Sequence, residues 1–343
     1  MRAAVYYNNH DIRVEERPVP AIGSGELLVR LESSGICGSD LMEWYRIHKA
    51  PLILGHEISG TIEKAGDAVR DFKSGQRVVC AHHVPCGRCH YCLNGHETVC
   101  DTLRKTNFDP GGFCEFLRLP EENVLSGVFI LPDTVSFDQG TFVEPLACVM
   151  RGQRLAGFKK GKSVLVLGSG IAGLMHILLA RAMGAEKIVS TDLDPYRLQK
   201  ALEFGADRSF SPQECTPEIL RGLNQGRLFD LAIVTAGSNA AIAQALESVE
   251  RGGTILFFAP ASKGAKIPLS FNELFWRAEV TLTSSYAASP REYLEALNLI
   301  ASGKINVSQM ITHVFGLEET AKGFSLVEHG KNSIKVIIHP QEK

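Results

Sequence analysis

The pattern of apolar and polar residues changes along the chain after about residue 137. Before that point, short apolar runs rich in β-branched residues are separated by glycine and proline; they cover residues 2–7, 26–32, 58–66, 76–82 and 113–119. This pattern is typical of a β-rich domain. Between residues 163 and 286, continuous apolar runs alternate with helical segments, as in a parallel sheet with helices on both faces. The sequence therefore predicts an α/β protein whose second domain is a doubly wound parallel sheet.

The last part of the chain returns to a mixture of helices and strands. Helices are expected over residues 290–303 and 317–330, and strands over residues 311–316 and 333–339. The residue pattern alone leaves open whether this tail joins the first domain. We expect three divisions of the chain, at residues 1–149, 150–287 and 288–343.

The most apolar segment, residues 163–180, has the uncharged character of a membrane span. It contains three glycines where a β-branched run gives way to helix-forming residues. A buried strand, a tight turn and a helix explain this order better than a membrane segment. We therefore predict no membrane partner.

The composition narrows the classes of function. At about 150 residues per domain, 343 residues predict two domains, and 45% hydrophobic with 22% charged residues is ordinary for a globular protein. The 36 Lys and Arg are scattered and balanced by 38 Asp and Glu, so no basic surface for nucleic acid is expected. The N-terminal residues lack the apolar core of a secretory signal, which favours a cytoplasmic protein.

Four of the nine cysteines stand close together, which indicates a metal site. Two, two and seven residues separate them: Cys86, Cys89, Cys92 and Cys100. A loop of this length, residues 86–100, can wrap one tetrahedral ion, and four thiolates leave no open position, so a structural zinc is expected. The alternatives are unrelated buried thiols and an iron–sulfur cluster, whose bacterial motif ends Cys-Pro, whereas Asp101 follows here. Because four thiolates saturate the ion, the nearby histidines are expected to be exposed loop residues: His82, His83, His90 and His96.

A glycine-rich turn predicts a dinucleotide site. Gly168, Gly170 and Gly173 follow an apolar strand. They open a helix that begins at Ile171 and Ala172. The first glycine makes the turn, the second lets the backbone approach the pyrophosphate, and the third lets helix and sheet pack closely. The N–H groups at the start of the helix then face the phosphates.

The residues after this turn favour NAD over NADP. Asp192 ends the next strand, nineteen residues after Gly173. A carboxylate there can accept hydrogen bonds from the adenosine ribose and would repel a 2′-phosphate. The alternative role of Asp192 is a helix N-cap, which Asp194 fits better. Arg197 is a candidate for binding a 2′-phosphate of the cofactor, or else it lies on a solvated helix face. His176, in the apolar helix, is expected to be a core residue.

A second set of metal-ligating residue types is scattered along the chain. Cys37 stands in GICGSD, and His56 and Glu57 stand in LGHEISG. Glu144 stands in FVEPLA. A catalytic zinc needs about three N, O or S ligands and one open position, which these residue types provide. Taken alone, the cysteine and the histidine fit better as a buried thiol and a core histidine.

Together these motifs make the sequence similar to the zinc-containing medium-chain dehydrogenases. The segments GICGSD, GHEISGTIEKAGDAVRDFKSGQRV, CGRCHYC, VEPLA and VLVLGSGIAG, with the closing helix and strand, stand in the family's order over nearly the whole chain. The resemblance implies a GroES-like β-rich catalytic domain split in sequence around a Rossmann domain, with the active site in the cleft between them. The EPLA segment, where alcohol dehydrogenases place a cysteine, is similar to the polyol (sorbitol) and threonine dehydrogenase branch.

The resemblance also implies roles for individual residues. It implies two zinc ions per chain, one structural and one catalytic, the catalytic one held by Cys37 and His56 with carboxylate from Glu57 and Glu144. Ser39 matches the hydroxyl that takes the substrate's proton. Asp40 matches the carboxylate that orients the ligating histidine.

Two departures from the family pattern concern the substrate pocket. Met42 stands where many relatives carry a histidine, so the proton relay beyond Ser39 is predicted to run through a solvent path or through His48. Only eighteen residues separate Cys37 from His56, fewer than in typical polyol dehydrogenases. The shortening bears on the substrate more than on the reaction. Residues of this loop are candidates for contacts with the substrate or form a solvated face: Glu43, Trp44, Arg46 and His48.

The expected activity is reversible oxidation of a secondary alcohol to a ketone with NAD. Zinc would act as a Lewis acid on the hydroxyl, Ser39 would accept the proton, and the hydride would pass to the nicotinamide. The substrate is expected to be a polyol, a cyclitol, a sugar-like alcohol or L-threonine. One alternative is a simple-alcohol dehydrogenase or aldehyde reductase; another is a non-catalytic NAD-binding sensor, which would be expected to lose Cys37, His56 or Ser39. A homodimer or homotetramer is expected.

Overall fold

The computed structural model describes residues 1–261, 263–330 and 332–342. The chain forms two compact units, one of Met1–Ala147 with Ala287–Lys343 and one of Cys148–Tyr286. Each unit has buried apolar clusters of its own. The tail, which the residue pattern left unassigned, therefore belongs to the first unit.

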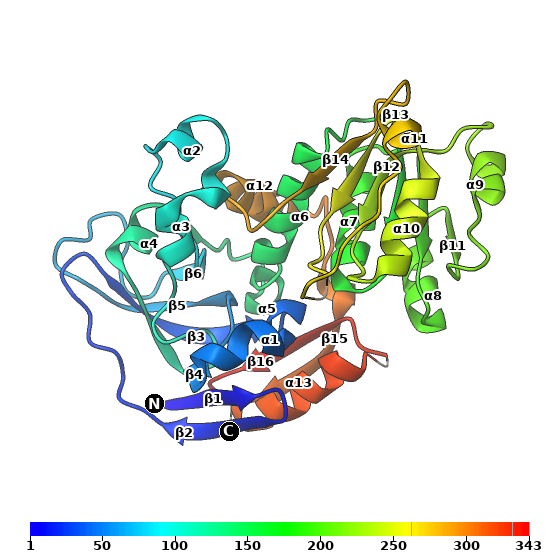
Figure 1. Ribbon diagram of the computed structural model, residues 1–343. Coiled ribbons are helices and arrows are strands. Elements are labelled where there is room, and N and C mark those ends of the chain that lie inside the picture. The colour runs from blue at the N-terminus through cyan, green and yellow to red at the C-terminus, as the bar shows by residue number, and fades with distance from the viewer. Residues whose placement is uncertain (262, 331, 343) are drawn as a thin grey trace. The chain divides into compact units, whose positions relative to one another are not determined.

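The unit of Cys148–Tyr286 contains a six-stranded parallel sheet in the order β11-β10-β9-β12-β13-β14 (Figure 1). Its strands are β9 (Ser163–Leu167), β10 (Lys187–Thr191), β11 (Arg208–Phe210), β12 (Phe229–Val234), β13 (Val249–Phe257) and β14 (Thr281–Ser284). Its helices are α7 (Ile171–Ala182), α8 (Pro195–Glu203), α9 (Pro217–Leu223), α10 (Asn239–Ser248) and α11 (Phe271–Leu274). The strand order reverses between β9 and β12, which is the switch point where dinucleotides bind in such sheets.

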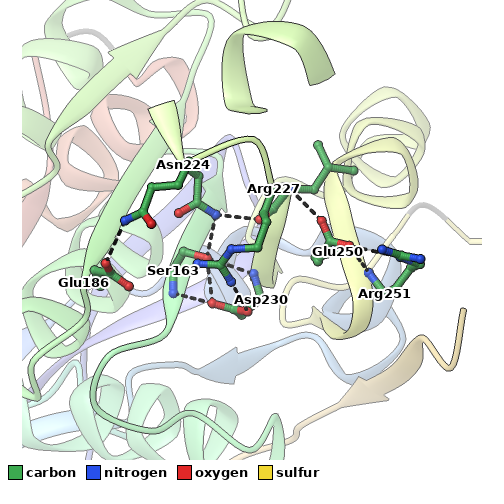
Figure 2. A network of polar contacts seen from close by, with 9 residues as sticks. Ser163, Glu186, Asn224, Arg227, Asp230, Glu250 and Arg251 are labelled. Atoms are coloured by element: carbon green, nitrogen blue, oxygen red, sulfur yellow. Dashed lines mark hydrogen bonds and ion pairs between the residues drawn. The ribbon is translucent and has the colours of Figure 1, made fainter. Parts of the chain in front are cut away.

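A network of polar contacts lies at the amino-terminal ends of β9 and β12 (Figure 2). Asp230 accepts hydrogen bonds from the backbone N–H (2.8 Å) and the hydroxyl (2.7 Å) of Ser163. The Asn224 amide donates to the Ser163 hydroxyl (3.2 Å) and to the Leu228 carbonyl (2.6 Å). These contacts join the two central strands at their amino ends and leave the carboxyl ends for the glycine turn.

The apolar segment of residues 163–180 is not one helix. It forms β9, the glycine turn and most of α7, as the glycines predicted. All five residues of β9 are buried. In the described part of the chain, the helices are too short or too polar for any of them to cross a membrane.

The other unit is built on a mixed sheet in the order β15-β16-β3-β5-β6-β8, with β7 also paired to β3, and on a small sheet in the order β2-β1-β4. The strands of the large sheet are β3 (Leu27–Gly35), β5 (Glu57–Ala65), β6 (Arg77–Cys80), β7 (Phe116–Leu119), β8 (Val128–Ile130), β15 (Ile311–Gly316) and β16 (Lys335–His339). The small sheet contains β1 (Arg2–Asn8), β2 (Asp11–Glu16) and β4 (Leu52–Ile53). Figure 1 shows α13 (Thr320–His329) beside β15, β16 and the small sheet.

The helices of this unit are mostly short. They are α1 (Glu43–Arg46), α2 (His90–Leu93), α3 (Asp101–Lys105), α4 (Glu121–Ser126), α5 (Phe137–Gly140), α12 (Pro290–Ala301) and α13, with the turns η1 (Gly38–Leu41), η2 (Ile47–Lys49), η3 (Glu97–Val99), η4 (Ser308–Met310) and η5 (Leu317–Glu319). One further helix, α6 (Val143–Leu155), contains residues of both units. The pairing of the long strands β3 and β5 brings together the residues of the site described below.

Candidate active site

The four clustered cysteines converge on one point. Their sulfur atoms lie within 4.8 Å of one another, and contacts of 3.5 Å (Cys89–Cys92), 3.6 Å (Cys86–Cys100) and 4.0 Å (Cys86–Cys92) join them. Four thiolates at about 2.3 Å from one zinc ion would be separated by about 3.8 Å. All nine cysteines are free thiols. The spacing therefore fits one tetrahedral ion better than a cluster that binds its thiolates through different irons.

Local hydrogen bonds prepare Cys100 to ligate a metal. Burial by itself would raise the pKa of this thiol, but backbone N–H groups of Cys86, Thr102 and Leu103 outweigh burial and lower its pKa to about 6. The N–H of Cys86 lies 3.5 Å from the Cys100 sulfur. Metals bind the thiolate form, so these hydrogen bonds favour at Cys100 the form that a zinc site needs, whereas burial raises the pKa of Cys92 to about 12.

The nearby histidines divide into two pairs. His90 and His96 are exposed, as expected. The expectation of exposure is wrong for His82 and His83, which are half-buried with ring centroids 4.0 Å apart. Both histidines directly follow β6, which pairs with β5. The Nδ1 of His83 hydrogen-bonds with the carbonyl of Thr106 (2.5 Å), which holds this ring against the protein.

The second metal set is assembled by the register of β3 and β5. Gly35 at the end of β3 pairs with Glu57 at the start of β5. Cys37 follows the first strand and His56 precedes the second, so the pairing brings them together. Ligand atoms of Cys37, His56 and Glu57 lie within 4.8 Å of one another. Glu144, in the first turn of α6, is buried but does not join this group of described ligand atoms.

Asp40 holds the histidine of this group. It is fully buried, and its Oδ1 lies 3.4 Å from Nδ1 of His56. Its other oxygen accepts a hydrogen bond from the backbone N–H of Cys37 (3.1 Å). Burial would raise the pKa of Asp40, but the His56 ring and this N–H outweigh burial and lower it. The carboxylate thus fixes which ring nitrogen faces the cysteine and glutamate.

Lys335 forms a buried ion pair with Glu57. The two side chains are 0% and 2% exposed, and the ammonium also donates to the carbonyl of Ile36 (3.3 Å). Lys335 begins β16, which pairs with β3 close to Gly35. Any side chain at Gly35 would collide with both partners. The negative charge of Glu57 is therefore balanced from a strand near the end of the chain.

The residues expected to carry the proton relay lie in the loop after Cys37. Ser39 is half-buried, and its N–H points to the sulfur of Cys37 (3.5 Å). Arg46 donates to the carbonyl of Ser39 (3.3 Å). His48, in η2, is exposed, and among the described residues no hydrogen bond joins it to Ser39. Its role stays a prediction.

A further imidazole, His82, lies against the metal set. Its ring centroid is 4.9 Å from that of His56, and its Nδ1 is buried without a hydrogen-bond partner in the described part of the chain. Burial, followed by the charge of neighbouring His83, holds the pKa of His82 well below its usual value. The lowered pKa keeps this ring neutral, so His82 adds no positive charge beside His56.

The glycine turn between β9 and α7 has the geometry expected of a phosphate cradle. Gly168 has φ +101°, and α7 begins at Ile171 with Gly170 as its N-cap and Ala172 in its first turn. A side chain at Gly173 would overlap the carbonyl oxygen of Gly168. The third glycine is therefore required for the helix to pack on the turn.

Asp192 is anchored at the end of β10. Its carboxylate accepts hydrogen bonds from the N–H groups of Ser169 (2.7 Å) and Asp194 (2.9 Å). Asp194 is the N-cap of α8, as expected. The guanidinium of Arg197 would lie 3.7 Å from a Cβ at Gly170, so it faces the same turn. His176 is fully buried in α7, which confirms its place in the core.

Two residues of these sites, Lys335 and His82, were not found by sequence reasoning. Lys335 had a signal, because a lysine inside the apolar strand KVIIH requires a buried partner. His82 follows a strand, but its contact with His56 depends on cross-strand register. Arg46 was considered only as a contact for the substrate.

Comparison with known proteins agrees with this geometry. The chain matches the alcohol dehydrogenase GroES-like domain over residues 23–133 and the zinc-binding dehydrogenase model over residues 172–302. It is 32% identical to a sorbitol dehydrogenase of Bacillus subtilis over 99% of this chain and 97% of the relative. Galactitol-1-phosphate dehydrogenase of Escherichia coli has a TM-score of 0.87 at 28% identity, covering 99% and 100% of the two chains. A protein of Sinorhizobium meliloti 1021, described as a zinc-binding dehydrogenase and bound to NADP, has a TM-score of 0.86 at 28% identity, covering 99% of each chain.

The fold and the site thus define an oxidoreductase that acts on an alcohol with zinc and a nicotinamide cofactor. The chain belongs to the zinc-containing medium-chain dehydrogenase family, in its polyol dehydrogenase branch. The family and the two fold types predicted from the motifs, a GroES-like domain and a Rossmann domain, are confirmed.

Proposed function

We propose that this enzyme oxidises a secondary alcohol of a polyol, a cyclitol, a sugar-like alcohol or L-threonine to the ketone, with NAD as hydride acceptor. The observation that carries the proposal is the cluster of Cys37, His56 and Glu57 beside the half-buried Ser39. A thiolate, an imidazole and a carboxylate are the ligand types of a catalytic zinc with an open position. When bound there, zinc supplies Lewis acidity that makes an alcohol a stronger acid.

The chain's own residues position and move the proton. Asp40 orients His56, and Lys335 balances the buried charge of Glu57. Ser39 is two residues from Cys37, where its hydroxyl takes the proton of the alcohol and passes it outward. Glu144 supplies a carboxylate from α6, directly or through water. The alcohol must lose its proton before the hydride leaves, so the site needs a group that accepts this proton.

The choice of NAD rests on Asp192. A fixed carboxylate at the end of β10 accepts the ribose hydroxyls and repels a 2′-phosphate. Arg197 opposes this effect because its guanidinium faces the same turn, and a similar structure holds NADP. We expect a lower KM for NAD than for NADP. Asp192→Ala should raise the KM for NAD and so reduce the difference between the KM values of the two cofactors. Faster turnover with NADP in the wild type would assign the ribose contact to Arg197 instead.

The test of the reaction is a substrate panel with the zinc-loaded full chain and NAD. Sorbitol, myo-inositol, L-threonine and 2,3-butanediol represent secondary alcohols, and ethanol and benzyl alcohol represent primary ones. We expect NADH to form with one or more secondary alcohols. Preference for a primary alcohol would mark a simple-alcohol dehydrogenase, and NAD binding without turnover across the panel would mark a sensor.

Three further properties belong to this proposal. The four-thiolate loop holds a structural zinc and the second cluster a catalytic one, so each chain holds two ions. Nine free thiols fit a reducing compartment, which supports the cytoplasm. The enzyme works as a homodimer or homotetramer, which size-exclusion chromatography with light scattering tests.

A further inference from the structure

The short loop between Cys37 and His56 gathers two cations on one aromatic ring. The guanidinium carbon of Arg46 lies 5.0 Å from the centroid of the Tyr45 ring, and the ammonium of Lys49 lies 4.8 Å from the same centroid. These residues belong to α1 and η2, which follow each other directly. Two cations near one ring raise the local positive potential, which an anion bound beside them would reduce.

Among the described residues of its unit, Arg46 is the half-buried arginine that has no carboxylate within 4.0 Å, although its charge helps to lower the pKa of the buried Asp40. Five arginines there are half-buried, and four of them lie within 4.0 Å of a carboxylate: Arg2, Arg30, Arg77 and Arg118. Among the described residues, neither Arg46 nor Lys49 has a carboxylate within that distance. Glu43, one turn before Arg46 in α1, accepts a hydrogen bond from the backbone N–H of Asn9 instead (3.2 Å).

The unpaired guanidinium is fixed beside the metal set. Its Nε donates to the carbonyl of Ser39, the residue proposed to take the substrate's proton. Its charge also reaches the imidazoles there: burial is the largest cause that lowers the pKa of His83 to about 4, and Arg46 and Lys49 both lower it further. A positive field at this point attracts negatively charged ligands.

We propose that Arg46, with Lys49 beside it, binds an anionic group of the substrate, so that the alcohol oxidised by this enzyme carries a carboxylate or a phosphate. The inference rests on the proposed function and names its substrate class. A guanidinium presents two parallel N–H groups to either anion, and the neighbouring ammonium adds a point charge. The hydroxyl to be oxidised then lies at the metal set while the charged end lies over α1.

Kinetics with three related substrates test this directly. Sorbitol is neutral, gluconate carries a carboxylate and sorbitol 6-phosphate carries a phosphate on a similar carbon chain. We expect a higher kcat/KM for one of the two anions than for sorbitol. In Arg46→Gln, the ratio of kcat/KM for that anion to kcat/KM for sorbitol should fall about ten- to hundredfold, the range of a charged hydrogen bond. Arg46→Lys should recover part of the ratio.

Two further variants separate binding from damage to the fold. Lys49→Gln changes an exposed side chain that does not contact Ser39, and it should lower the same ratio by a smaller factor. Arg13→Gln is the matched control, because Arg13 also lies over a tyrosine ring (Tyr7, 4.6 Å) but is paired with Asp11. It should leave the ratio unchanged.

A binding measurement without NAD gives a second readout. Trp44 lies in α1 beside the cations, with its ring 6.0 Å from that of Tyr45, and the chain has one other tryptophan, Trp276. In a Trp276→Phe background, gluconate or inorganic phosphate should change the fluorescence of Trp44 saturably, and sorbitol should not. Arg46→Gln should abolish the change.

The outcomes distinguish this inference from the proposed function. Turnover of sorbitol at least as efficient as that of both anions, with no fluorescence response to gluconate or phosphate, would overturn the anionic substrate and leave the dehydrogenase intact. An equal fall for neutral and charged substrates in Arg46→Gln would assign Arg46 to positioning Ser39 only. No turnover of any alcohol by the zinc-loaded enzyme would overturn the proposed function itself.

Discussion

The two metal-ligating clusters of this enzyme are built in opposite ways. The four thiols of the first lie within fifteen residues, on a loop with exposed residues between them. The second takes its ligands from the ends of two paired strands, and its carboxylate, 2% exposed, is balanced by a lysine 278 residues further along the chain. The ligands of the first cluster are neighbours in the sequence, whereas those of the second come together only when the strands of the sheet have paired.

We expect the first cluster to stabilise its loop and the second to take part in the reaction. A closed set of four thiolates offers no position to a substrate, so it serves the structure of its loop. In the function proposed above, the second cluster keeps a position open for the substrate; its Glu57 carries a buried charge that Lys335 balances only in the folded sheet. The predictions below exploit this contrast.

The largest contrast is expected on metal removal. Brief chelation should remove the ion of the Cys37–His56–Glu57 cluster with all activity, because an open site exchanges ligands readily. The ion of the four-thiolate loop should stay, together with the fold. Metal content and far-UV circular dichroism measured in parallel test this. Loss of both ions at once, or one ion per chain at the outset, would contradict the assignment.

Breaking the buried ion pair should cost the most stability. Lys335→Met leaves Glu57 as an uncompensated charge and should lower the free energy of unfolding by about 3–5 kcal/mol, measured by urea denaturation. The matched control is Lys335→Met with Glu57→Gln, which should recover most of this loss because no lone charge remains. A single variant as stable as the wild type would show that water or another cation reaches Glu57.

Removing the relay hydroxyl should lower turnover without affecting either cluster. Ser39→Ala should lose about a hundredfold or more in kcat, the scale of a general acid–base group. Metal content should remain that of the wild type. Near-normal turnover would exclude Ser39 from the proton path.

The dependence of kcat on pH decides where the proton goes after Ser39. His48→Gln should change the dependence of kcat on pH if the exposed imidazole accepts the proton from Ser39. An unchanged profile would assign the outward step to solvent.

The smallest effect is expected at the far end of the strand that carries Lys335. There the hydrogen bond from His339 to Asp138 (2.7 Å) raises the pKa of His339 to about 9. A raised pKa stabilises the fold fully below the unfolded value of about 6.5, and this contribution disappears as the pH rises through about 9. His339→Gln should remove at most about 1 kcal/mol because the pair is partly exposed, and this loss should be full below about pH 6.5 and absent above about pH 9. Urea denaturation at pH 5.5 and at pH 10, values about one unit outside the window on either side, compares the two forms. An equal loss at both pH values would exclude the ion pair as the cause.

Much of the molecule was determined by local sequence. The glycine turn was found because its three glycines follow an apolar strand and precede helix-forming residues, an order that leaves few other conformations. The four-thiolate loop was found because its ligands are close in the chain, so spacing alone limits their geometry. The buried parallel strands β9, β10, β12 and β13 were visible because burial on both faces requires continuous apolar runs, whereas the short β11 was not among the predicted strands.

The tertiary structure decided the rest. The pairing of β16 with β3 places Lys335 on Glu57, and the packing of the short loop leaves Arg46 without a carboxylate while fixing it to Ser39. His82 lies against His56 because of the register of β5 and β6, although both expected strands were correct. Strand register and loop packing bring together residues that are distant in the chain. Contacts between distant residues stabilise this arrangement, and a local sequence pattern does not predict them. The sequence therefore determined the fold and most of the candidate ligands, whereas the charges around these candidates were set only when the strands came together.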